Sequence, residues 1–339
     1  MKTKSRAGAV SSIPPKVRDL VRASREAMIL NAAAAHEIFD AIRPRGSSAS
    51  EVSRAKRLSP RAVELVLNAL VAEGFLKKRA GVYFNSPIAK KYLVTSSPAS
   101  IIGSLQHGNN VTKRWARLDE ALKSGPIRET PKWERGKAVR ETAVFARAMF
   151  VNARDAAAAL PEMVDPRDCR SLIDIGGGVG HFSFFLCKKY PRLTATVFDF
   201  PATLREARKY FKMYRMGGRL RAAPGDFTKT ELPRSFDAAL VSQIIHSYGE
   251  KENLALFRKV YRCLNPGGIF ILRNFLLNPD RTSPSNAAVF AINMLVNTRR
   301  GRTYSFDEVT GWMRKAGFRK IRRVGRPAFG DASVMTAEK

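Results

Sequence analysis

Cysteine is scarce in this chain, with three residues in a sequence of 339. Cys169, Cys187 and Cys263 are far apart and form no C-x-x-C pair, so the sequence predicts neither a disulfide framework nor a zinc site. Chains without disulfides are typical of reducing compartments. We therefore expect a cytoplasmic protein that binds no metal.

Long apolar segments are also missing. The amino-terminal stretch MKTKSRAGAVSSIPPK has basic residues but lacks the apolar core of a secretory signal. No apolar run approaches the roughly 18 residues that a membrane-spanning helix requires. The overall apolar content of 45% is ordinary, and the length is sufficient for about two globular domains.

Acidic residues are outnumbered: 29 Asp and Glu against 60 Lys and Arg give a net charge of +31. Such an excess indicates a nucleic acid, an anionic membrane surface or an acidic substrate as a possible partner. The excess is divided almost evenly between residues 1–165 and 166–339. We interpret it as a property of the whole surface, which makes nucleic acid a disfavoured partner.

A glycine-rich turn, with the sequence DIGGGVG at 174–180, organises the second half of the chain. The apolar run Ser171–Ile175 predicts a buried strand, and Phe182–Lys189 predicts a helix after the glycines. Strand, glycine turn and helix together open a nucleotide-binding β-α-β unit. The alternative is a glycine turn that binds no ligand.

The spacing of the glycines indicates which nucleotide is bound. Gly176 and Gly178 fit the dinucleotide fingerprint, but His181 occupies its third glycine position. Asp174 lies inside the strand end, where an acid suits a ligand without phosphates that carries cationic groups and hydroxyls. S-adenosylmethionine is such a ligand, and we predict it as the cofactor.

Two further acids end the next two predicted strands. Asp199 directly follows the predicted strand Thr194–Phe198. Its separation along the chain from the glycine turn is close to the roughly 20 residues at which such units carry a ribose-binding acid. Asp226 and Phe227 follow Leu220–Ala223, where they could bind the adenine amine and stack on its ring. Three acids thus stand at three successive strand ends. Chance alone would rarely produce such a group, so we interpret the three as parts of one site.

The region 15–98 is typical of a winged-helix module. A long helix from Pro15 to about Ile42 comes first, and Ser48 and Ser59 are the predicted N-caps of the next two helices. These are followed by a hairpin. The predicted elements are helices Glu51–Arg57 and Arg61–Glu73 and strands Leu76–Arg79 and Val82–Phe84.

A winged helix that reads DNA should offer basic or amide side chains on its recognition helix. The outward-facing set on the second of these helices is Arg61, Glu64, Asn68 and Glu73. Two acids out of four would be repelled by phosphates. We therefore predict a dimerisation module rather than a DNA reader.

The predicted organisation has four parts: a disordered arm (1–14), the dimerisation domain (15–98), a helical connector and lid (99–165) and a cofactor-binding domain (166–339). Strands alternate with helices in the last part, which predicts an α/β fold with a Rossmann-like, doubly wound, seven-stranded sheet. An antiparallel pair, Arg319–Val324 with Ser333–Ala337, closes it. Candidate pocket walls in the connector, with ordinary core packing as the alternative, are Trp115, Trp133, Phe145, Met149 and Phe150.

Among the four histidines, only His246 follows a strand end opposite the predicted cofactor, after Phe236–Val241. Methyl transfer requires alignment of acceptor, methyl and sulfur, and removal of a proton from a hydroxyl acceptor. A histidine with a pKa of about 6.5 suits a phenol-like hydroxyl with a pKa near 10. His246 is thus the candidate base, and an ordinary loop histidine is the alternative.

The order of these parts resembles the class I small-molecule O-methyltransferases with an N-terminal winged-helix dimerisation domain, such as the caffeate and acetylserotonin enzymes. The resemblance covers residues 15–338. It rests on DIGGGVG (174–180), VFDFP (197–201), GDF (225–227), VSQIIHSY (241–248), NPGG (265–268) and GRTYSFDEVTGWMRKAGF (301–318).

This resemblance implies a homodimer and a set of site residues. His246 matches the catalytic base. Gly176 and Gly178 match the glycines against the methionine part of the cofactor, Asp199 the ribose acid, and Asp226 with Phe227 the adenine pair. Ser242 stands where plant members have a cofactor-contacting lysine, and Asp174 and Phe200 complete the predicted cofactor-binding set.

Three departures from the family pattern concern the base. Ser247-Tyr248 replaces the usual Asp-Trp, Asn274 replaces the glutamate that orients the histidine, and Arg299–Thr303 contains no second glutamate. A histidine without acidic partners is a weaker base. The acceptor could therefore be a more acidic hydroxyl, or another atom.

The sequence thus predicts O-methylation of a small aromatic molecule. Two alternatives remain open. The first is a nucleic-acid methyltransferase that uses the basic surface, although Ser-Gln-Ile-Ile after the fourth strand is not the motif of exocyclic-amine methylation. The second is a winged-helix regulator with a cofactor-sensing domain.

Overall fold

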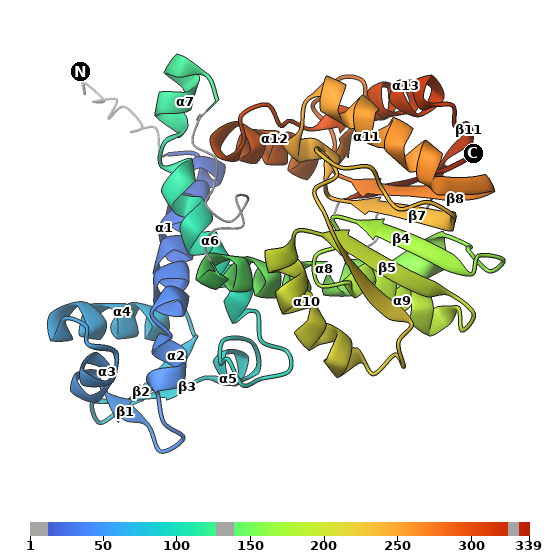
Figure 1. The fold of residues 1–339 in the computed structure, drawn as a ribbon. Helices are drawn as coiled ribbons and strands as arrows, with labels where there is room; N and C mark the ends of the chain where they lie inside the picture. The colour runs from blue at the N-terminus through green and yellow to red at the C-terminus, as the bar shows by residue number, and fades with distance from the viewer. Residues whose placement is uncertain (1–12, 127–138, 325–331) are drawn as a thin grey trace, which may run out of the picture. The chain divides into compact units, whose positions relative to one another are not determined.

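The structure is a computed structural model that describes residues 13–126, 139–324 and 332–339 (Figure 1). It divides into two compact units, Met1–Asn109 and Asn110–Lys339. Most of the predicted arm and the candidate pocket residue Trp133 lie outside the described residues. Within the described ranges, no helix is long and apolar enough to cross a membrane.

The first unit is mainly helical with a small three-stranded sheet. Its sheet has the order β1-β3-β2, all antiparallel, so the predicted hairpin is confirmed and gains a third strand. The elements are α1 (Pro15–Ala35), α2 (Ile38–Ala41), β1 (Ser47–Ser48), α3 (Ala49–Lys56), α4 (Pro60–Ala72), β2 (Leu76–Arg79), β3 (Val82–Asn85), α5 (Pro87–Tyr92) and the start of α6 (Ile102–Trp115).

The long first helix is shorter than predicted. It ends at Ala35, because Glu37 adopts the left-handed conformation with φ +52°. This break redirects the chain, and α2 buries Ile38 and Phe39 in the core of the unit. Local helical periodicity does not reveal such a break, because it depends on where the core lies.

The two predicted N-caps behave differently. Ser48 forms a full capping box, in which its side chain accepts from the Glu51 amide and the Glu51 carboxylate accepts from the Ser48 amide. Ser59 is the N-cap of α4, with Pro60 in the first turn, as predicted, although its side chain makes no capping hydrogen bond. All four residues predicted to face outward on α4 are exposed.

The second unit is built on a seven-stranded sheet with the order β11-β12-β8-β7-β4-β5-β6. Strands β4 to β8 are mutually parallel, whereas β12 and β11 run antiparallel at the edge, as predicted. The strands are β4 (Ser171–Ile175), β5 (Thr194–Asp199), β6 (Leu220–Pro224), β7 (Phe236–Ser242), β8 (Leu264–Asn274), β11 (Arg319–Val324) and β12 (Ser333–Glu338).

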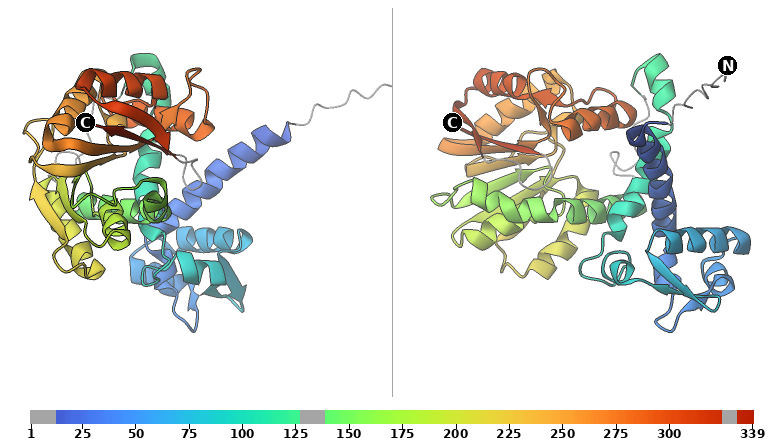
Figure 2. Two further views of the ribbon diagram at one scale, coloured as in Figure 1. Left: turned by 90° about the vertical axis from the view of Figure 1, so that its right-hand side faces the viewer. Right: turned by 180° about the vertical axis from the view of Figure 1, so that it is seen from behind.

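Helices cover both faces of this sheet (Figures 1 and 2). α11 and α13 pack on one face, and α8, α9 and α10 on the other. The order is the doubly wound α/β arrangement expected from the sequence. The helices of this unit are α7 (Leu118–Ser124), α8 (Val139–Met163), α9 (His181–Lys189), α10 (Pro201–Tyr214), α11 (Glu250–Cys263), α12 (Ser285–Asn297) and α13 (Phe306–Ala316).

Strand β8 is longer than predicted. The sequence indicated a turn at Asn265–Gly268 before a strand at Ile269–Leu272, whereas the observed strand starts at Leu264. Its register with β7 shifts at this point, because Phe236 pairs with Leu264 and Ala238 already pairs with Ile269. The turn residues are therefore absorbed as an irregularity of the strand. At its other end, β8 extends to Asn274 and delivers this side chain to the site.

Candidate active site

The glycine loop between β4 and α9 closes directly over Asp174. A Cβ atom added at Gly177 would lie 2.6 Å from Asp174 Oδ2, so a side chain there would collide with the carboxylate. Gly176 has φ +69°, and its added Cβ would lie 2.3 Å from Ile244 Cδ1. Gly178 has φ +58° and open space around its Cβ position. The loop thus needs glycine for backbone conformation and for close approach.

Asp174 is almost completely buried, at 1% exposure. Its Oδ2 accepts a hydrogen bond of 2.7 Å from Ser183 Oγ, while Oδ1 has no partner among the described residues. Burial raises the pKa of Asp174 to about 7. An unsatisfied buried carboxylate oxygen favours a cationic or hydrogen-donating ligand group next to it.

Asp199, at the end of β5, receives one backbone N–H on each oxygen. Gly178 N donates to Oδ2 at 2.9 Å, and Phe200 N donates to Oδ1 at 2.7 Å. Burial raises the pKa of Asp199, and these hydrogen bonds oppose the rise. The Thr203 side chain also hydrogen-bonds to this carboxylate. A carboxylate has about four lone-pair sites, so capacity remains for a ligand hydroxyl.

Asp226 and Phe227 follow β6, as predicted. Burial alone would raise the pKa of Asp226, but hydrogen bonds from Thr228 and the Lys229 ammonium outweigh it and lower the pKa. Asp226 Oδ1 is occupied by the Thr228 amide at 2.9 Å. Phe227 is buried, and its ring packs edge-on against Tyr248 at 5.2 Å.

His246 lies in a short 3-10 turn, Ile245–Ser247, just after β7. It is 8% exposed, and burial lowers its pKa to about 4, although its hydrogen bond to Asn274 acts in the opposite direction. His246 Nδ1 lies 3.1 Å from Asn274 Oδ1. The imidazole is therefore neutral at physiological pH.

The Asn274 amide fixes the tautomer of this histidine. Its Nδ2 donates to the carbonyl of Phe275 at 3.3 Å, which leaves Oδ1 as the acceptor for His246. His246 Nδ1 then carries the proton, and Nε2 keeps a free lone pair. Asn274 therefore makes this contact with His246 at the position of the expected glutamate, without its charge.

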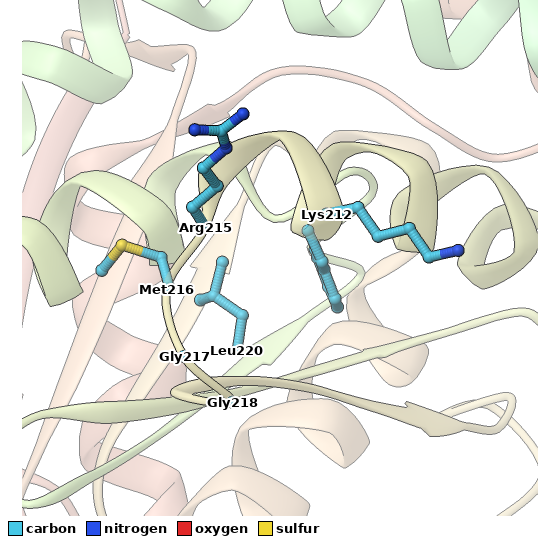
Figure 3. Close-up of a pocket in the computed structure, with 7 residues that line it drawn as sticks. Lys212, Arg215, Met216, Gly217, Gly218 and Leu220 are labelled. Atoms are coloured by element: carbon cyan, nitrogen blue, oxygen red, sulfur yellow. The ribbon is translucent and has the colours of Figure 1, made fainter.

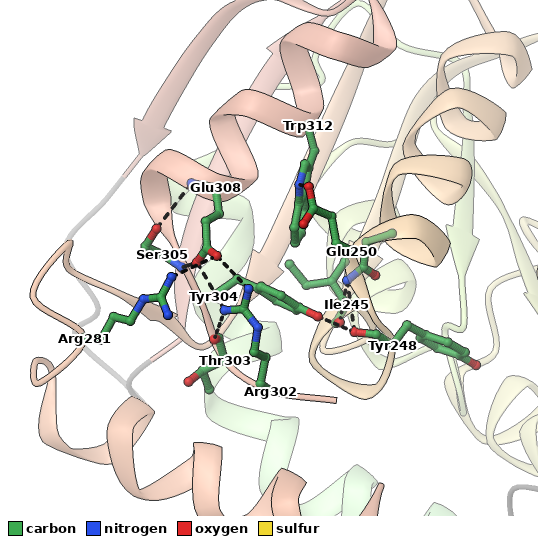
Figure 4. Close-up of polar contacts among 11 residues, drawn as sticks. Ile245, Tyr248, Glu250, Arg281, Arg302, Thr303, Tyr304, Ser305, Glu308 and Trp312 are labelled. Atoms are coloured by element: carbon green, nitrogen blue, oxygen red, sulfur yellow. Dashed lines mark hydrogen bonds and ion pairs between the residues drawn. The ribbon is translucent and has the colours of Figure 1, made fainter. Parts of the chain in front are cut away.

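The loop that carries His246 is held by a network of buried and part-buried polar contacts (Figure 4). Asn253 Nδ2 donates to the Ile245 carbonyl at 2.9 Å, and Tyr304 Oη donates to the Tyr248 carbonyl. Arg302 stacks on the Tyr304 ring and pairs with Glu308 at 2.7 Å. These bonds fix the backbone on both sides of the histidine.

The basic loop at 299–302 therefore differs from a freely solvated loop. Arg300 pairs with Glu252 at 2.8 Å, and Arg302 is held by Glu308. Gly301 packs on the histidine itself, because an added Cβ would lie 2.3 Å from the His246 carbonyl oxygen. A cavity of about 320 Å³ next to this loop is lined by Ser247–Gly249, Glu252 and Asn297–Arg300.

Helix α12 contributes residues that the sequence prediction did not assign to the site. Phe290 packs edge-on against the His246 ring at 4.8 Å, and its ring is tilted against that of Phe275 at 4.4 Å. One turn to either side of Phe290, Asn293 Oδ1 accepts from Trp115 Nε1 at 2.9 Å, and Asn286 Nδ2 is buried without a partner among the described residues. Their helical spacing (286, 290, 293) was the available signal, because it places amides and a ring on one face.

Of the other candidate pocket walls, Phe150 stacks on His181 with ring centroids 4.3 Å apart. Another cavity of about 320 Å³, between the end of α10 and the start of β6, is separate from the site (Figure 3). It is lined by Lys212, Arg215 and Gly217, among others, at the amino end of the parallel strands. The predicted acids lie at the opposite, carboxyl end, where doubly wound sheets bind ligands.

A doubly wound sheet of this order, with a glycine loop after its first strand, is the fold of S-adenosylmethionine-dependent methyltransferases. The model of the O-methyltransferase domain matches residues 130–319, and that of the O-methyltransferase dimerisation domain matches residues 19–95. The chain belongs to the O-methyltransferase family. It is an S-adenosylmethionine-dependent enzyme, as the sequence predicted.

Relatives and solved structures agree with this assignment. A 3-hydroxy-5-methyl-1-naphthoate 3-O-methyltransferase of Streptomyces sahachiroi is 30% identical, over 98% of this chain and 99% of the relative. Acetylserotonin O-methyltransferase of Mus musculus is 26% identical over 94% and 87%. An O-methyltransferase family protein from Burkholderia thailandensis has a TM-score of 0.82 at 25% identity, over 96% and 99%. Human N-acetylserotonin methyltransferase, in complex with SAM, has a TM-score of 0.83 at 23% identity, over 97% and 99%.

The residues present fit the cofactor. Asp174 Oδ1 and Ser242 Oγ are buried polar atoms without partners among the described residues, and the Cβ position of Gly178 is open. The two backbone bonds of Asp199 and its bond with the Thr203 side chain leave a lone pair for a hydroxyl. Orphan polar atoms beside an open glycine edge are what a polar, phosphate-free ligand requires.

Proposed function

We propose that this enzyme transfers the methyl group of S-adenosylmethionine to a hydroxyl of a small aromatic molecule, with His246 as general base. The observation that carries the proposal is the hydrogen bond between His246 Nδ1 and Asn274 Oδ1, 3.1 Å long, in a buried setting at the carboxyl end of the sheet. It leaves Nε2 of a neutral imidazole free to accept a proton.

The cofactor, when bound, supplies a methyl group that its sulfonium has already activated. The chain's own residues then position the acceptor and receive its proton. Phe290 and Phe275 offer aromatic walls beside His246. These rings favour an aromatic acceptor, and the curated relatives include methyltransferases named for a hydroxynaphthoate, tetracenomycin and acetylserotonin.

The neutral partner of His246 favours acidic hydroxyls. When Nε2 takes a proton, the imidazolium finds an amide oxygen rather than a carboxylate, so its charge is less stabilised. A hydroxyl with a lowered pKa needs a weaker base. We therefore propose acceptors whose phenol is acidified by a conjugated carbonyl or a fused ring.

Label transfer tests the proposed function. The purified protein and methyl-labelled S-adenosylmethionine are offered separately to total RNA and to a panel of phenols of graded pKa. We expect label in the phenols, with kcat/KM rising as the phenol pKa falls. Label in RNase-sensitive material would overturn the proposal and support a nucleic-acid substrate.

We further propose that the first unit dimerises through α1. This helix exposes Val17, Leu20, Val21 and Met28, with side chains 48% to 72% exposed. Their spacing places most of them on one stripe, and an exposed apolar stripe favours burial against a partner. The dimerisation-domain model covers most of this helix. A second copy of the chain is the proposed partner, with the N-terminal region acting as its dimerisation domain.

Leu20→Glu is expected to shift the protein from dimer to monomer, because it places a charge in the centre of the apolar stripe. Size-exclusion chromatography with light scattering measures the mass. Leu122→Glu is the matched control, because Leu122 on α7 is 74% exposed but lies in the second unit. An unchanged mass for Leu20→Glu, or an equal loss for both variants, would contradict this interface.

A further inference from the structure

Arg273, near the end of β8, is a buried cation without an anionic partner among the described residues. It is 6% exposed, and its guanidinium makes no hydrogen bond or ion pair with any residue that the structure describes. The guanidinium carbon lies over the Phe182 ring, 5.1 Å from the ring centroid. A ring face satisfies none of the five N–H donors, and arginine is almost never buried unless it is paired.

The neighbours of Arg273 along the sheet are known from the strand register. Arg273 pairs with Ser242 on β7, and two residues earlier Leu240 pairs with Asp174 on β4. Side chains alternate along a strand, so Asp174, Leu240, Ser242 and Arg273 share one face. That face is covered by α9, because Leu240 and Phe182 belong to the same core cluster. Asn274, which follows Arg273, faces the opposite side with His246.

Two further groups on this face lack partners. Ser242 Oγ and Asp174 Oδ1 are buried without a hydrogen bond to any described residue. Arg273, Ser242, Leu240 and Asp174 thus form a row across this face of the sheet. The donors Arg273 and Ser242 lie at one end of the row, and the acceptor Asp174 lies at the other. Phe182 belongs to the first turn of α9, so the partial positive charge of the helix N-terminus adds to that of Arg273.

A ligand for this row needs an anionic oxygen at one end and an N–H donor at the other. Arg273 and Asp174 are two strands apart, about 10 Å across the sheet, and two residues apart along the strands, about 7 Å, so their backbones lie about 12 Å apart. Two hydrogen bonds of about 2.9 Å span part of that distance, and the long arginine side chain can adjust the remainder. An α-amino acid group carries both charges at a separation that fits.

We propose that Arg273, together with Ser242, binds the carboxylate of the methionine part of S-adenosylmethionine, while Asp174 receives its ammonium group. The inference rests on the proposed placement of the cofactor at the glycine loop, and it adds a cofactor-binding residue that neither motif nor spacing indicates. Arg273 anchors the end of the cofactor farthest from the adenine. A carboxylate on the acceptor is the less favoured ligand, because His246 and Asn274 lie on the other side of the sheet.

Arg273→Met tests this assignment by calorimetry with two probes, S-adenosylhomocysteine and 5′-methylthioadenosine. Both carry the adenosine part, but only the first has the amino acid group. We expect Arg273→Met to weaken S-adenosylhomocysteine binding by about 10- to 100-fold, the loss typical of a hydrogen-bonded charge. The affinity for 5′-methylthioadenosine should stay within about twofold of the wild-type value. Arg273→Lys keeps the charge but not the bidentate geometry of the guanidinium. Its affinity for S-adenosylhomocysteine should therefore lie between those of the wild type and Arg273→Met.

Arg322→Met is the matched control, because Arg322 lies on β11 of the same sheet and is exposed. Equal losses for both probes in Arg273→Met would show a structural role and overturn the proposal, as would unchanged binding of S-adenosylhomocysteine. A melting temperature close to that of the wild type verifies that the variant is folded. If the wild-type protein bound neither probe, the proposed cofactor site itself would be wrong, which distinguishes that failure from an error about Arg273.

Discussion

His246→Gln is expected to lower kcat by about 100- to 10,000-fold, the usual contribution of a general base, while S-adenosylhomocysteine binding stays within about twofold. The loss follows from the geometry, because His246 is the ring whose free Nε2 is set by Asn274. Turnover and calorimetry measured on the same preparation separate the two effects. His36→Gln is the matched control, since His36 is exposed at the end of α1.

The protonation of His246 also predicts how activity and stability depend on pH. Burial lowers the pKa of His246 to about 4, and the neutral ring is the active form, so activity should fall only as the pH drops toward 4. The unfolded chain binds a proton at its ordinary pKa of about 6.5, so this residue also makes the protein less stable as the pH falls from 6.5 to 4. His246→Gln should remove both effects.

Asn274→Asp provides the companion variant. A carboxylate next to Nδ1 stabilises the imidazolium, so the acid limb of the pH–rate profile should move upward from about 4 toward neutrality. The stronger base should also accept less acidic phenols. If His246→Gln kept wild-type turnover, or if the acid limb stayed in place in Asn274→Asp, the histidine would not be the base.

Asp199→Asn is expected to weaken S-adenosylhomocysteine binding by about 10- to 150-fold or more, the equivalent of one or two hydrogen bonds to a charged group. The carboxylate accepts from Gly178 N and from Phe200 N, one on each oxygen. An amide has only one acceptor oxygen, so its NH₂ group would face a backbone N–H donor. The substitution therefore disturbs the glycine loop as well as the proposed ribose contact.

Asp237→Asn is the control for this prediction. Asp237 Oδ2 also accepts backbone bonds, from Arg170 N at 2.9 Å and Ser171 N at 3.1 Å, but it lies near the amino end of β7. We expect it to lower the melting temperature and leave cofactor affinity unchanged. If Asp199→Asn bound S-adenosylhomocysteine as tightly as the wild type, the ribose assignment would be wrong.

The sequence by itself determined the parts of this protein that depend on local pattern. Strand β4 and the capping box at Ser48 follow from residues within one or two turns of each other. The placement of Asp199 and Asp226 also needed no tertiary information, because parallel strands that alternate with helices end at the same edge of a sheet. The predicted family and cofactor followed from the order of these motifs.

Only the tertiary structure decided what depends on pairing between distant segments. Asn274 was recognised as a missing glutamate, but its bond to His246, 28 residues away, comes from the neighbouring positions of β7 and β8. Arg273 had no signal in the sequence, because local pattern does not show whether a charge near a strand end is buried and unpaired. The burial that holds His246 neutral has the same origin, since a pKa is set by everything packed around the ring.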